Sequence, residues 1–421
     1  MRRPPEPDTA DRGHVIRLDP TVKQAEAMAR ACGVSRFTWN WALAEWDRQY
    51  KAGECPTPAK LKFRWNSVKR DLYPWVLESP RDANSQPFAD LGRAFANYFA
   101  SLKGERRGRK IQRPQFKRKG VHDSFYVAND KFECHSRGKR GVVRLPVIGN
   151  VKTFEALRFR GKILSGRVFR QAGWWYLSVN VETRVKRPES FPNEIVGVDL
   201  GLKTAVVCSD GAKHDAPKPL RQALRQLRRV NRQLHRRKKG GCNRRKSQLR
   251  VARIHQRVGN IRKDFLHKIT SKICRENQAV VIEDLNVDGM VKNRRLSRAV
   301  SDVGLGSFRP LCEYKARGRV IVADRWFPSS RRCSRCGNVR VDLSLSERIY
   351  RCDKCGLTID RDLNAALNLM QYPRLQGNWG DGNVARTPTE TSASARRTRV
   401  RRASRVDEVG TRTEVLRGFP S

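Results

Sequence analysis

Residues 194–207, EIVGVDLGLKTAVV, combine the pattern of a buried strand with an acidic side chain at its end. The residues before Asp199 are mostly apolar and β-branched, which is typical of a strand covered on both faces. A carboxylate at the end of such a strand must be paired, hydrogen-bonded or bound to a cation, because an unpaired buried charge is costly. The stretch therefore predicts an α/β domain and a partner for Asp199.

A second apolar run, QAVVIEDLN at residues 278–286, ends in Glu283 in the same way. Strand ends are where open α/β sheets place their sites. Farther on, DRDLNAALNLM at residues 360–370 starts like a capped helix. Taken alone, Asp360 or Asp362 is explained as an ordinary acidic residue of a first helical turn.

Together, Asp199, Glu283 and Asp362 indicate a metal site. Three carboxylates from two strand ends and one helix can hold two divalent ions about 4 Å apart, an arrangement that hydrolyses phosphodiesters. Mg²⁺ prefers such oxygen ligands, and Mn²⁺ is the alternative ion. A bound cation would explain why Asp199 tolerates burial.

The chain is strongly basic, with 89 Lys and Arg against 41 Asp and Glu, a formal net charge of +48 over 421 residues. Self-repulsion on this scale disfavours a compact state unless a polyanion neutralises it, so we expect a nucleic-acid partner. Purely architectural nucleic-acid binding, as by a ribosomal protein, would satisfy the charge equally well.

No apolar stretch approaches the roughly 18 residues of a membrane span, and the first residues, MRRPPEPDTADRGH, contain no apolar signal core. We therefore expect a chain of the bacterial cytoplasm, associated with the nucleoid and without a membrane partner. The 11 cysteines fit a reducing compartment, because seven are scattered singly.

The other four cysteines form two CxxC pairs within CSRCGNVRVDLSLSERIYRCDKCG, residues 333–356. Cys333, Cys336, Cys352 and Cys355 match the four thiolates of a tetrahedral structural zinc site. Gly337 and Gly356 follow the pairs and permit the tight turns that aim the sulfurs inward. A redox motif is the weaker reading, since two matched pairs would then be a coincidence.

The N-terminal half is expected to hold a β-domain with helices inserted into it. A strand near residues 14–18 precedes helical segments from about 21 to 103, and residues 124–183 read as short strands with a hairpin at Gly173. Phe37, Trp41, Leu43 and Trp46 have helical spacing and are predicted to be core. The last fifty residues lack aliphatic periodicity and are predicted to be disordered.

Residues 216–263 contain no Asp or Glu. Apolar residues at helical spacing on both sides of Gly240 predict two amphipathic helices with arginine-rich faces, including Arg228, Arg232 and Arg236. Such faces are often merely solvated, but without compensating acids they favour contact with RNA or DNA.

Four motifs that occur in a fixed order are a far more specific family signature than any one of them. VGVDLGLKTAVV, VVIEDLNVDGM followed by KNRRLSRAVSDVGLGSFR, FPSSRRCSRCG and CGLTIDRDLNAALNL resemble the TnpB (OrfB) proteins encoded by bacterial insertion sequences, which are related to compact type V CRISPR effectors. The resemblance is dense over about 195–370 and looser in the N-terminal half.

The resemblance implies an RNA-guided DNA endonuclease. It implies a RuvC-type nuclease domain with an RNase H-like fold at residues 191–371, containing the zinc ribbon at 333–355. A wedge-like β-barrel domain at 1–190 with a helical recognition insertion would precede it, and an arginine-rich tail would follow from residue 372. By motif the catalytic acids are Asp199, Glu283 and Asp362, with Asp360 as the substitute for Asp362.

The family's partners would be a guide RNA from the transposon end and double-stranded target DNA, read beside a short adjacent motif by residues near Tyr50 and Gln86. Two other functions stay open at this stage. A guide-directed repressor of the same fold should have lost an acid, whereas a cut-and-paste transposase would also use an acid triad. The sequence does not indicate the oligomeric state.

Overall fold

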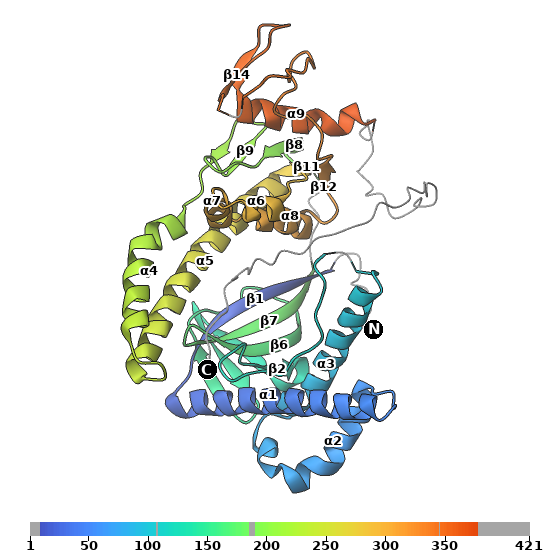
Figure 1. The fold of residues 1–421 in the computed structure, drawn as a ribbon, viewed down its shortest axis with the longest axis vertical. Coiled ribbons are helices and arrows are strands. Elements are labelled where there is room, and N and C mark those ends of the chain that lie inside the picture. The colour runs from blue at the N-terminus through green and yellow to red at the C-terminus, as the bar shows by residue number, and fades with distance from the viewer. Residues whose placement is uncertain (1–8, 107, 185–189, 345, 378–421) are drawn as a thin grey trace, which may run out of the picture. The chain divides into compact units, whose positions relative to one another are not determined.

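A computed structural model describes residues 9–106, 108–184, 190–344 and 346–377 (Figure 1). These residues form two compact units, the first up to residue 184 and the second from residue 190. The predicted disordered tail starts at residue 372, but residues 372–375 are the last turn of a helix, α9 (Arg361–Leu375), and the tail from residue 378 lies outside the described residues.

The first unit contains a seven-stranded antiparallel sheet in the order β2-β6-β7-β1-β5-β4-β3. Its strands are β1 (Thr9–Asp19), β2 (Ser124–Ala128), β3 (Glu133–Arg137), β4 (Arg140–Leu145), β5 (Gly149–Thr153), β6 (Lys162–Gln171) and β7 (Trp174–Arg184). The pairings of the described strands run in one line from β2 to β3, so closure into a barrel stays a prediction.

The hairpin between β6 and β7 confirms the expected turn. Ala172 and Gly173 both have positive φ, 49° and 82°, as the two central residues of a type I′ turn require. Arg170 pairs with Trp175 and Gln171 with Trp174 directly beside this turn.

A helical block follows β1 and ends before β2. It comprises α1 (Val22–Lys51), α2 (Pro58–Leu72), the 3₁₀ helix η1 (Pro74–Glu78) and α3 (Arg81–Leu102); a short η2 (Asn129–Lys131) lies after β2. Because β1 pairs with β7 and β5, which come much later in the chain, the helices are an insertion into the sheet. Leu43 and Trp46 are buried, and Trp46 stacks on Phe95 with ring centroids 4.1 Å apart, which confirms the predicted core face of α1.

The second unit is built around a mixed five-stranded sheet in the order β10-β9-β8-β11-β12. Its strands are β8 (Asn193–Asp199), β9 (Val206–Cys208), β10 (Lys213–His214), β11 (Asn277–Glu283) and β12 (Val320–Ala323). β11 is parallel to both β8 and β12, whereas β9 is antiparallel to β8 and β10. The structure is therefore of mixed α/β class.

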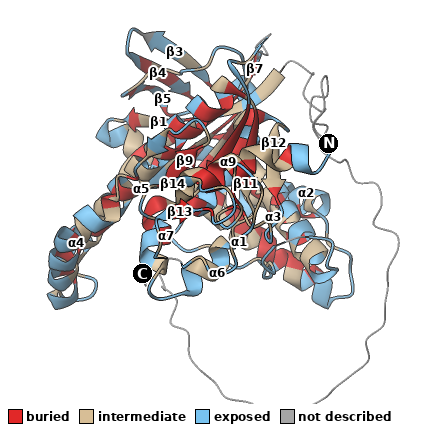
Figure 2. Ribbon diagram, turned by 90° about the horizontal axis from the view of Figure 1, so that it is seen from above, coloured by how far each residue is buried: buried red, intermediate tan, exposed pale blue. Residues whose placement is uncertain are grey.

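Helices cover both faces of this sheet. The remaining elements are α4 (Pro219–Arg236), α5 (Cys242–Glu276), α6 (Val287–Lys292), α7 (Ser297–Val303), η3 (Leu305–Ser307), α8 (Phe308–Ala316), α9 (Arg361–Leu375) and the hairpin β13 (Ile349–Arg351) and β14 (Thr358–Asp360). Val196 and Val198 pack with α5 and α8, whereas Ile195 packs with Leu369 of α9. The central strands β8 and β11 are accordingly buried on both faces, as their continuous apolar sequence predicts (Figure 2).

α4 and α5 form a helical hairpin joined at Gly240 and Gly241. Leu227, Val230 and Leu234 of α4 pack with Val251 of α5 in a small separate core. This contact confirms the apolar seam expected from the sequence.

A candidate active site at the carboxyl edge of the mixed sheet

Two of the predicted acids lie at the ends of neighbouring strands. β8 and β11 run parallel with Val198 opposite Ile282, so their last residues, Asp199 and Glu283, leave the sheet at the same edge. Both side chains are partly buried. The parallel register thus places Asp199 and Glu283 at the ends of adjacent strands, although they are 84 positions apart in the sequence.

The third acid is delivered by α9, which lies across one face of the sheet (Figure 1). Gly197 makes that close approach possible, because a Cβ at this position would overlap the carbonyl oxygen of Ala366 and the backbone nitrogen of Met370. The glycine of VGVD therefore sets how near the first turn of α9, with Asp362, can come to Asp199.

The pKa of Asp199 responds to both of the other acids. Burial, followed by the charges of Glu283 and Asp362, raises the pKa of Asp199 to about 8. Ser329 Oγ donates a hydrogen bond to Glu283 Oε1 and fixes that side chain. Asp362 lies 3.9 Å from Arg348 Nη1 and 3.7 Å from Arg361 Nε.

This donor set suits a divalent cation. Carboxylates held close together repel one another, and a cation that neutralises them together removes that repulsion. Their spacing is looser than that of the cysteines: within the described residues, only the four cysteines place three or more candidate ligand atoms within 4.8 Å of one another.

Asp360 has a different task from Asp362. Its Oδ1 accepts hydrogen bonds from the backbone N–H groups of Asp362 and Leu363, at 2.9 and 3.0 Å, and so caps α9. Its Oδ2 accepts from Lys213 Nζ at 2.7 Å, and this contact helps to lower its pKa. The geometry favours Asp362, rather than the predicted substitute Asp360, as the acid that faces Asp199.

The four predicted cysteines come together in a site that can hold a metal ion. The Sγ atoms of Cys333 and Cys355 are 3.6 Å apart, and those of Cys336 and Cys352 are 3.5 Å apart. A tetrahedral ion with metal–sulfur bonds of about 2.3 Å would set its ligands roughly 3.8 Å apart, which agrees within a few tenths of an ångström.

The turns around these cysteines confirm the role expected for the glycines. Gly337 and Gly356 have φ of 76° and 72° and donate to the carbonyl oxygens of Cys333 and Cys352. Backbone N–H groups of Cys355 and Lys354 help to hold the pKa of Cys352 at about 6, so that thiol is prepared to act as a thiolate.

Two buried asparagines, which the sequence reasoning missed, connect this cysteine site to α9. Asn364 Nδ2 and Asn368 Nδ2 both donate to the carbonyl oxygen of Arg332, at 2.7 and 2.6 Å, and Asn364 Oδ1 accepts from Ser334 N–H. Both asparagines are completely buried. Their spacing of four residues within the otherwise apolar stretch 363–370 of α9 is the signal that could have revealed them.

The predicted nucleic-acid contacts lie on separate elements. Tyr50 is 68% exposed near the end of α1, and Gln86 of α3 donates to Asp90 Oδ1 at 3.1 Å. Arg228, Arg232 and Arg236 are exposed along α4. The acids lie at the sheet edge and not among these arginines.

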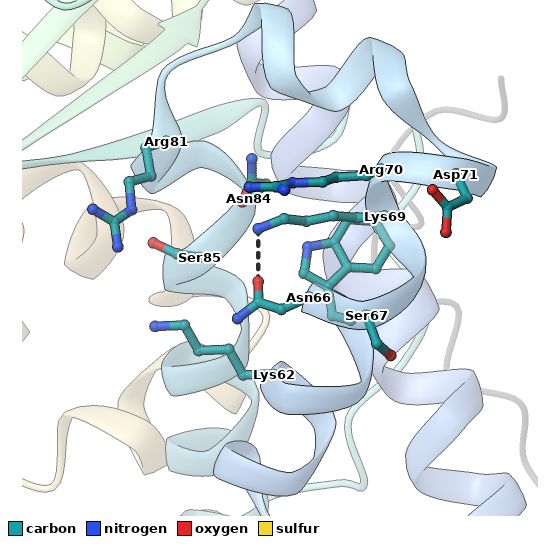
Figure 3. A pocket seen from close by; sticks show the side chains of 10 residues that line it. Lys62, Asn66, Ser67, Lys69, Arg70, Asp71, Arg81, Asn84 and Ser85 are labelled. Carbon is teal, nitrogen blue, oxygen red and sulfur yellow. Dashed lines mark hydrogen bonds between the residues drawn. The ribbon is translucent and has the colours of Figure 1, made fainter.

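A basic pocket between α2 and α3 was not foreseen. It has a volume of about 390 Å³ and is lined by four cations, Lys62, Lys69, Arg70 and Arg81, and one acid, Asp71, together with polar residues such as Asn66, Asn84 and Ser85 (Figure 3). Burial, and then the charges of Arg70, Arg81 and Lys62, lowers the pKa of Lys69. Such concentrated positive charge suits an anion.

No helix in the part of the chain that the structure describes is long and apolar enough to cross a membrane.

Three family models match the chain. The OrfB_IS605 model, described as a probable transposase, covers residues 178–294, and the Cas12f1-like TNB domain model covers residues 306–369. A model described as a helix-turn-helix domain covers residues 10–55, where the structure has β1 and the single long helix α1.

Two solved structures are similar in fold. A Cas12f1–sgRNA–target DNA complex matches with a TM-score of 0.51 and 13% identity, covering 83% of this chain and 82% of that one. The mini-RNA-guided endonuclease Cas_phi3 matches with a TM-score of 0.50 and 7% identity, covering 86% and 92%.

Curated relatives are similar over nearly the whole chain. A Streptomyces pristinaespiralis protein, provisionally named an RNA-guided DNA endonuclease, is 33% identical over 397 residues, which cover 91% of this chain and 94% of that protein. The Escherichia coli protein InsQ, with the same provisional name, is 28% identical over 84% of this chain and 90% of its own length. The chain therefore belongs to the TnpB (OrfB) family of insertion-sequence-encoded RNA-guided endonucleases.

Proposed function

We propose that this protein is an RNA-guided DNA endonuclease encoded by a transposable element, with Asp199, Glu283 and Asp362 as its catalytic acids. The observation that carries the proposal is the convergence of these three carboxylates from β8, β11 and α9 in a chain of net charge +48. Acids gathered in so basic a protein are best explained by a shared cation and a polyanionic substrate.

Two Mg²⁺ ions, with Mn²⁺ as the alternative, would be held by Asp199, Glu283 and Asp362. Bound there, such ions would activate water and stabilise the leaving oxygen of a phosphodiester. The protein's own contribution is to hold the ligands in place: Ser329 orients Glu283, and Gly197 lets α9 carry Asp362 close to β8.

The second unit is proposed to be a RuvC-type nuclease domain with an RNase H-like fold. The mixed sheet with acids at its carboxyl edge supports this assignment. The first unit is proposed to be the wedge-like β-domain, with α1 to α3 as its helical recognition insertion. The cysteine site is proposed to bind one structural Zn²⁺, since four protein thiolates leave no open position for a reactant.

The partners proposed are a guide RNA derived from the transposon end and a double-stranded DNA target in the bacterial cytoplasm. Arg228, Arg232 and Arg236 are placed to contact a phosphate backbone, because they are exposed on α4, opposite the seam with α5. The α2–α3 pocket, together with Tyr50 and Gln86, supports contact with DNA beside the target. Cationic side chains of the first unit can bind DNA phosphates directly, without an acid or a metal ion.

The two alternatives are less well supported. A repressor has no need of three acids held together by a capped helix, a serine hydrogen bond and a close-approach glycine. Transposase activity is the description attached to one family model, and the relatives that match over most of the chain carry the endonuclease name.

Asp199→Ala separates these functions. The variant is expected to bind guide RNA and matched DNA with near-parent affinity, whereas Mg²⁺-dependent cleavage falls roughly a thousandfold or more. Asp342→Ala, which removes an exposed acid between the two cysteine pairs, is the matched control and should cleave like the parent.

Guide-independent cutting by the parent, or undiminished cutting by Asp199→Ala, would overturn the proposal. A repressor would show no metal-dependent cleavage of matched DNA even in the parent. A transposase would join transposon ends to target DNA without a complementary guide.

A further inference from the structure

The loop after β12 brings one unusual side chain to the edge of the sheet that carries the acids. Ala323, the last residue of β12, lies opposite Glu283 in parallel register. Trp326 follows three residues later, so its Cα lies within about 11 Å of that of Ala323. Its side chain is 85% exposed, the most exposed of the large apolar side chains in the described residues.

Hydrogen bonds and packing anchor the loop on both sides of the exposed Trp326 ring. Trp326 N–H donates to Asp324 Oδ1 at 2.8 Å, and Asp324 N–H donates to Tyr372 Oη at 3.2 Å. Phe327 turns inward and packs edge-on against Tyr372, with ring centroids 4.9 Å apart. Ser329 holds Glu283, and its carbonyl oxygen accepts from Asn368.

Packing in the core does not explain why a tryptophan stands at position 326. The neighbouring residues anchor the loop, whereas the Trp326 ring is exposed to solvent. Single exposed apolar residues are common on protein surfaces. A tryptophan is a poor choice for such a position, because it leaves a large apolar area in water without compensation. The same loop could have been closed with a polar residue.

The charges beside Trp326 favour a nucleic-acid strand as its partner. Arg325 Nη2 and Arg309 Nη1 bind the two oxygens of Asp284 at 2.9 and 3.0 Å, so the acid next to Glu283 is already neutralised. Both arginines remain nearly half exposed. A flat aromatic face flanked by guanidinium groups is the combination that binds single-stranded nucleic acid through stacking and phosphate contacts.

We propose that Trp326 is a substrate-positioning residue that stacks on an unpaired DNA base next to the phosphodiester to be cut. This inference rests on the proposed endonuclease function, in which pairing of a guide with one DNA strand leaves the other strand single. Stacking tolerates any base, so Trp326 would fix the distance along the strand without selecting sequence. The clamped loop would transmit that position to Glu283 through Ser329.

The test uses the full chain with its guide and a series of matched duplexes, each with a single abasic nucleotide at a different position of the cleaved region. In the parent, one abasic position should slow cleavage between about fivefold and a hundredfold. Trp326→Ala should slow cleavage of intact DNA by a similar factor and lose its sensitivity at that one position. Trp326→Phe, which keeps an aromatic face, should restore much of the rate and the sensitivity.

Tyr314→Ala is the control, because Tyr314 is a 52% exposed aromatic residue of the same unit, on α8. It should respond to abasic positions as the parent does. Equal abasic profiles for the parent and Trp326→Ala would overturn the proposal, because a merely structural role slows every substrate alike.

A readout that needs no cleavage separates this inference from the endonuclease proposal. With 2-aminopurine at the sensitive position, or at each position in turn if the parent does not cut, stacking on Trp326 should quench the fluorescence of the bound strand. The quenching should be lost in Trp326→Ala and retained in Trp326→Phe. Identical quenching in the parent, Trp326→Ala and Trp326→Phe would refute stacking on Trp326. Quenching that depends on Trp326 in a parent that does not cleave DNA would support stacking and refute the endonuclease proposal.

Discussion

The ionisation of Asp199, the last residue of β8, depends on the charges of two other acids. Its pKa is raised to about 8, first by burial and then by Glu283 and Asp362. An unfolded aspartate titrates near about 3.9. Between these pH values the folded chain retains a proton that the unfolded chain has lost, so the free energy of unfolding should fall as the pH rises through this window.

We therefore expect the parent without Mg²⁺ to lose stability between about pH 5 and about pH 8 relative to Asp199→Asn, whose side chain carries no charge. Each kcal/mol corresponds to about 2–4 °C in a unit of this size. Thermal unfolding measured without chelator, so that any metal at the cysteine site is retained, checks this. Added Mg²⁺ should flatten the parent's curve; parallel curves for the two proteins would contradict the coupling.

Gly197 makes a second residue-scale prediction. Adding a methyl group there must push backbone atoms of α9, which cannot rotate away as a side chain could. Gly197→Ala should lower the melting temperature by several degrees, about 1–3 kcal/mol for an overpacked site, and reduce cleavage more than guide binding. Gly259→Ala is the matched control, since a Cβ there meets nothing within 4 Å and alanine favours the helix α5.

At the scale of elements, α9 joins the cysteine site to the acids. β14 follows Cys355 directly and leads into α9, while Asn364 and Asn368 bind the first cysteine turn through Arg332. A loss of order at the cysteines should therefore reach the first turn of α9, where Asp362 lies.

Cys352→Ser is accordingly expected to lower bound zinc and cleavage together. Asn364→Ala should leave zinc content near that of the parent but destabilise α9 by about 1–3 kcal/mol, because the Ser334 N–H loses its acceptor and the Arg332 carbonyl oxygen loses one of its two donors. Metal content by atomic spectroscopy and cleavage rates, measured on the same preparations, distinguish the two effects. Full cleavage by a zinc-free Cys352→Ser protein would refute the link.

The hairpin of α4 and α5 should act through charge rather than packing. Replacing Arg228, Arg232 and Arg236 with glutamine should weaken guide binding and reduce its log–log salt dependence by roughly 0.7–0.9 per lost phosphate contact. The melting temperature of the RNA-free variant should stay close to the parent's, because these side chains are exposed. An unchanged salt slope would mean that α4 presents a merely solvated face.

The central strands of the second unit and the acids at their ends could be predicted from the sequence because each leaves a local pattern. β8 and β11 read as apolar runs that end in Asp199 and Glu283, and the cysteine spacing encodes the metal site directly. The spacing of Asn364 and Asn368 could have marked these two residues, but their partners Arg332 and Ser329 could not be predicted, since the contacts depend on how α9 lies against the chain some thirty to forty residues earlier. The basic pocket of α2 and α3 was missed for the same reason: its cations are neighbours only after folding.

For the whole molecule, the net charge of +48 determines how stability depends on salt. In the RNA-free protein most charge pairs repel, and salt weakens that repulsion as the Debye length falls from about 10 Å at 0.1 M to about 3 Å at 1 M. In a guide complex most pairs between protein and RNA attract, so the same salt should weaken the complex.

We therefore expect opposite signs when NaCl is raised from about 0.1 M to about 1 M: a higher melting temperature for the RNA-free protein and a lower one for the guide-bound protein. Heparin, a polyanion without base pairs, is the control and should reproduce the stabilisation at low salt without conferring cleavage of matched DNA. If the RNA-free protein instead lost stability with added salt, its positive charges would already be compensated within the fold. The basic composition could then not be explained by a nucleic-acid partner, and the exposed arginines of α4 would need another role.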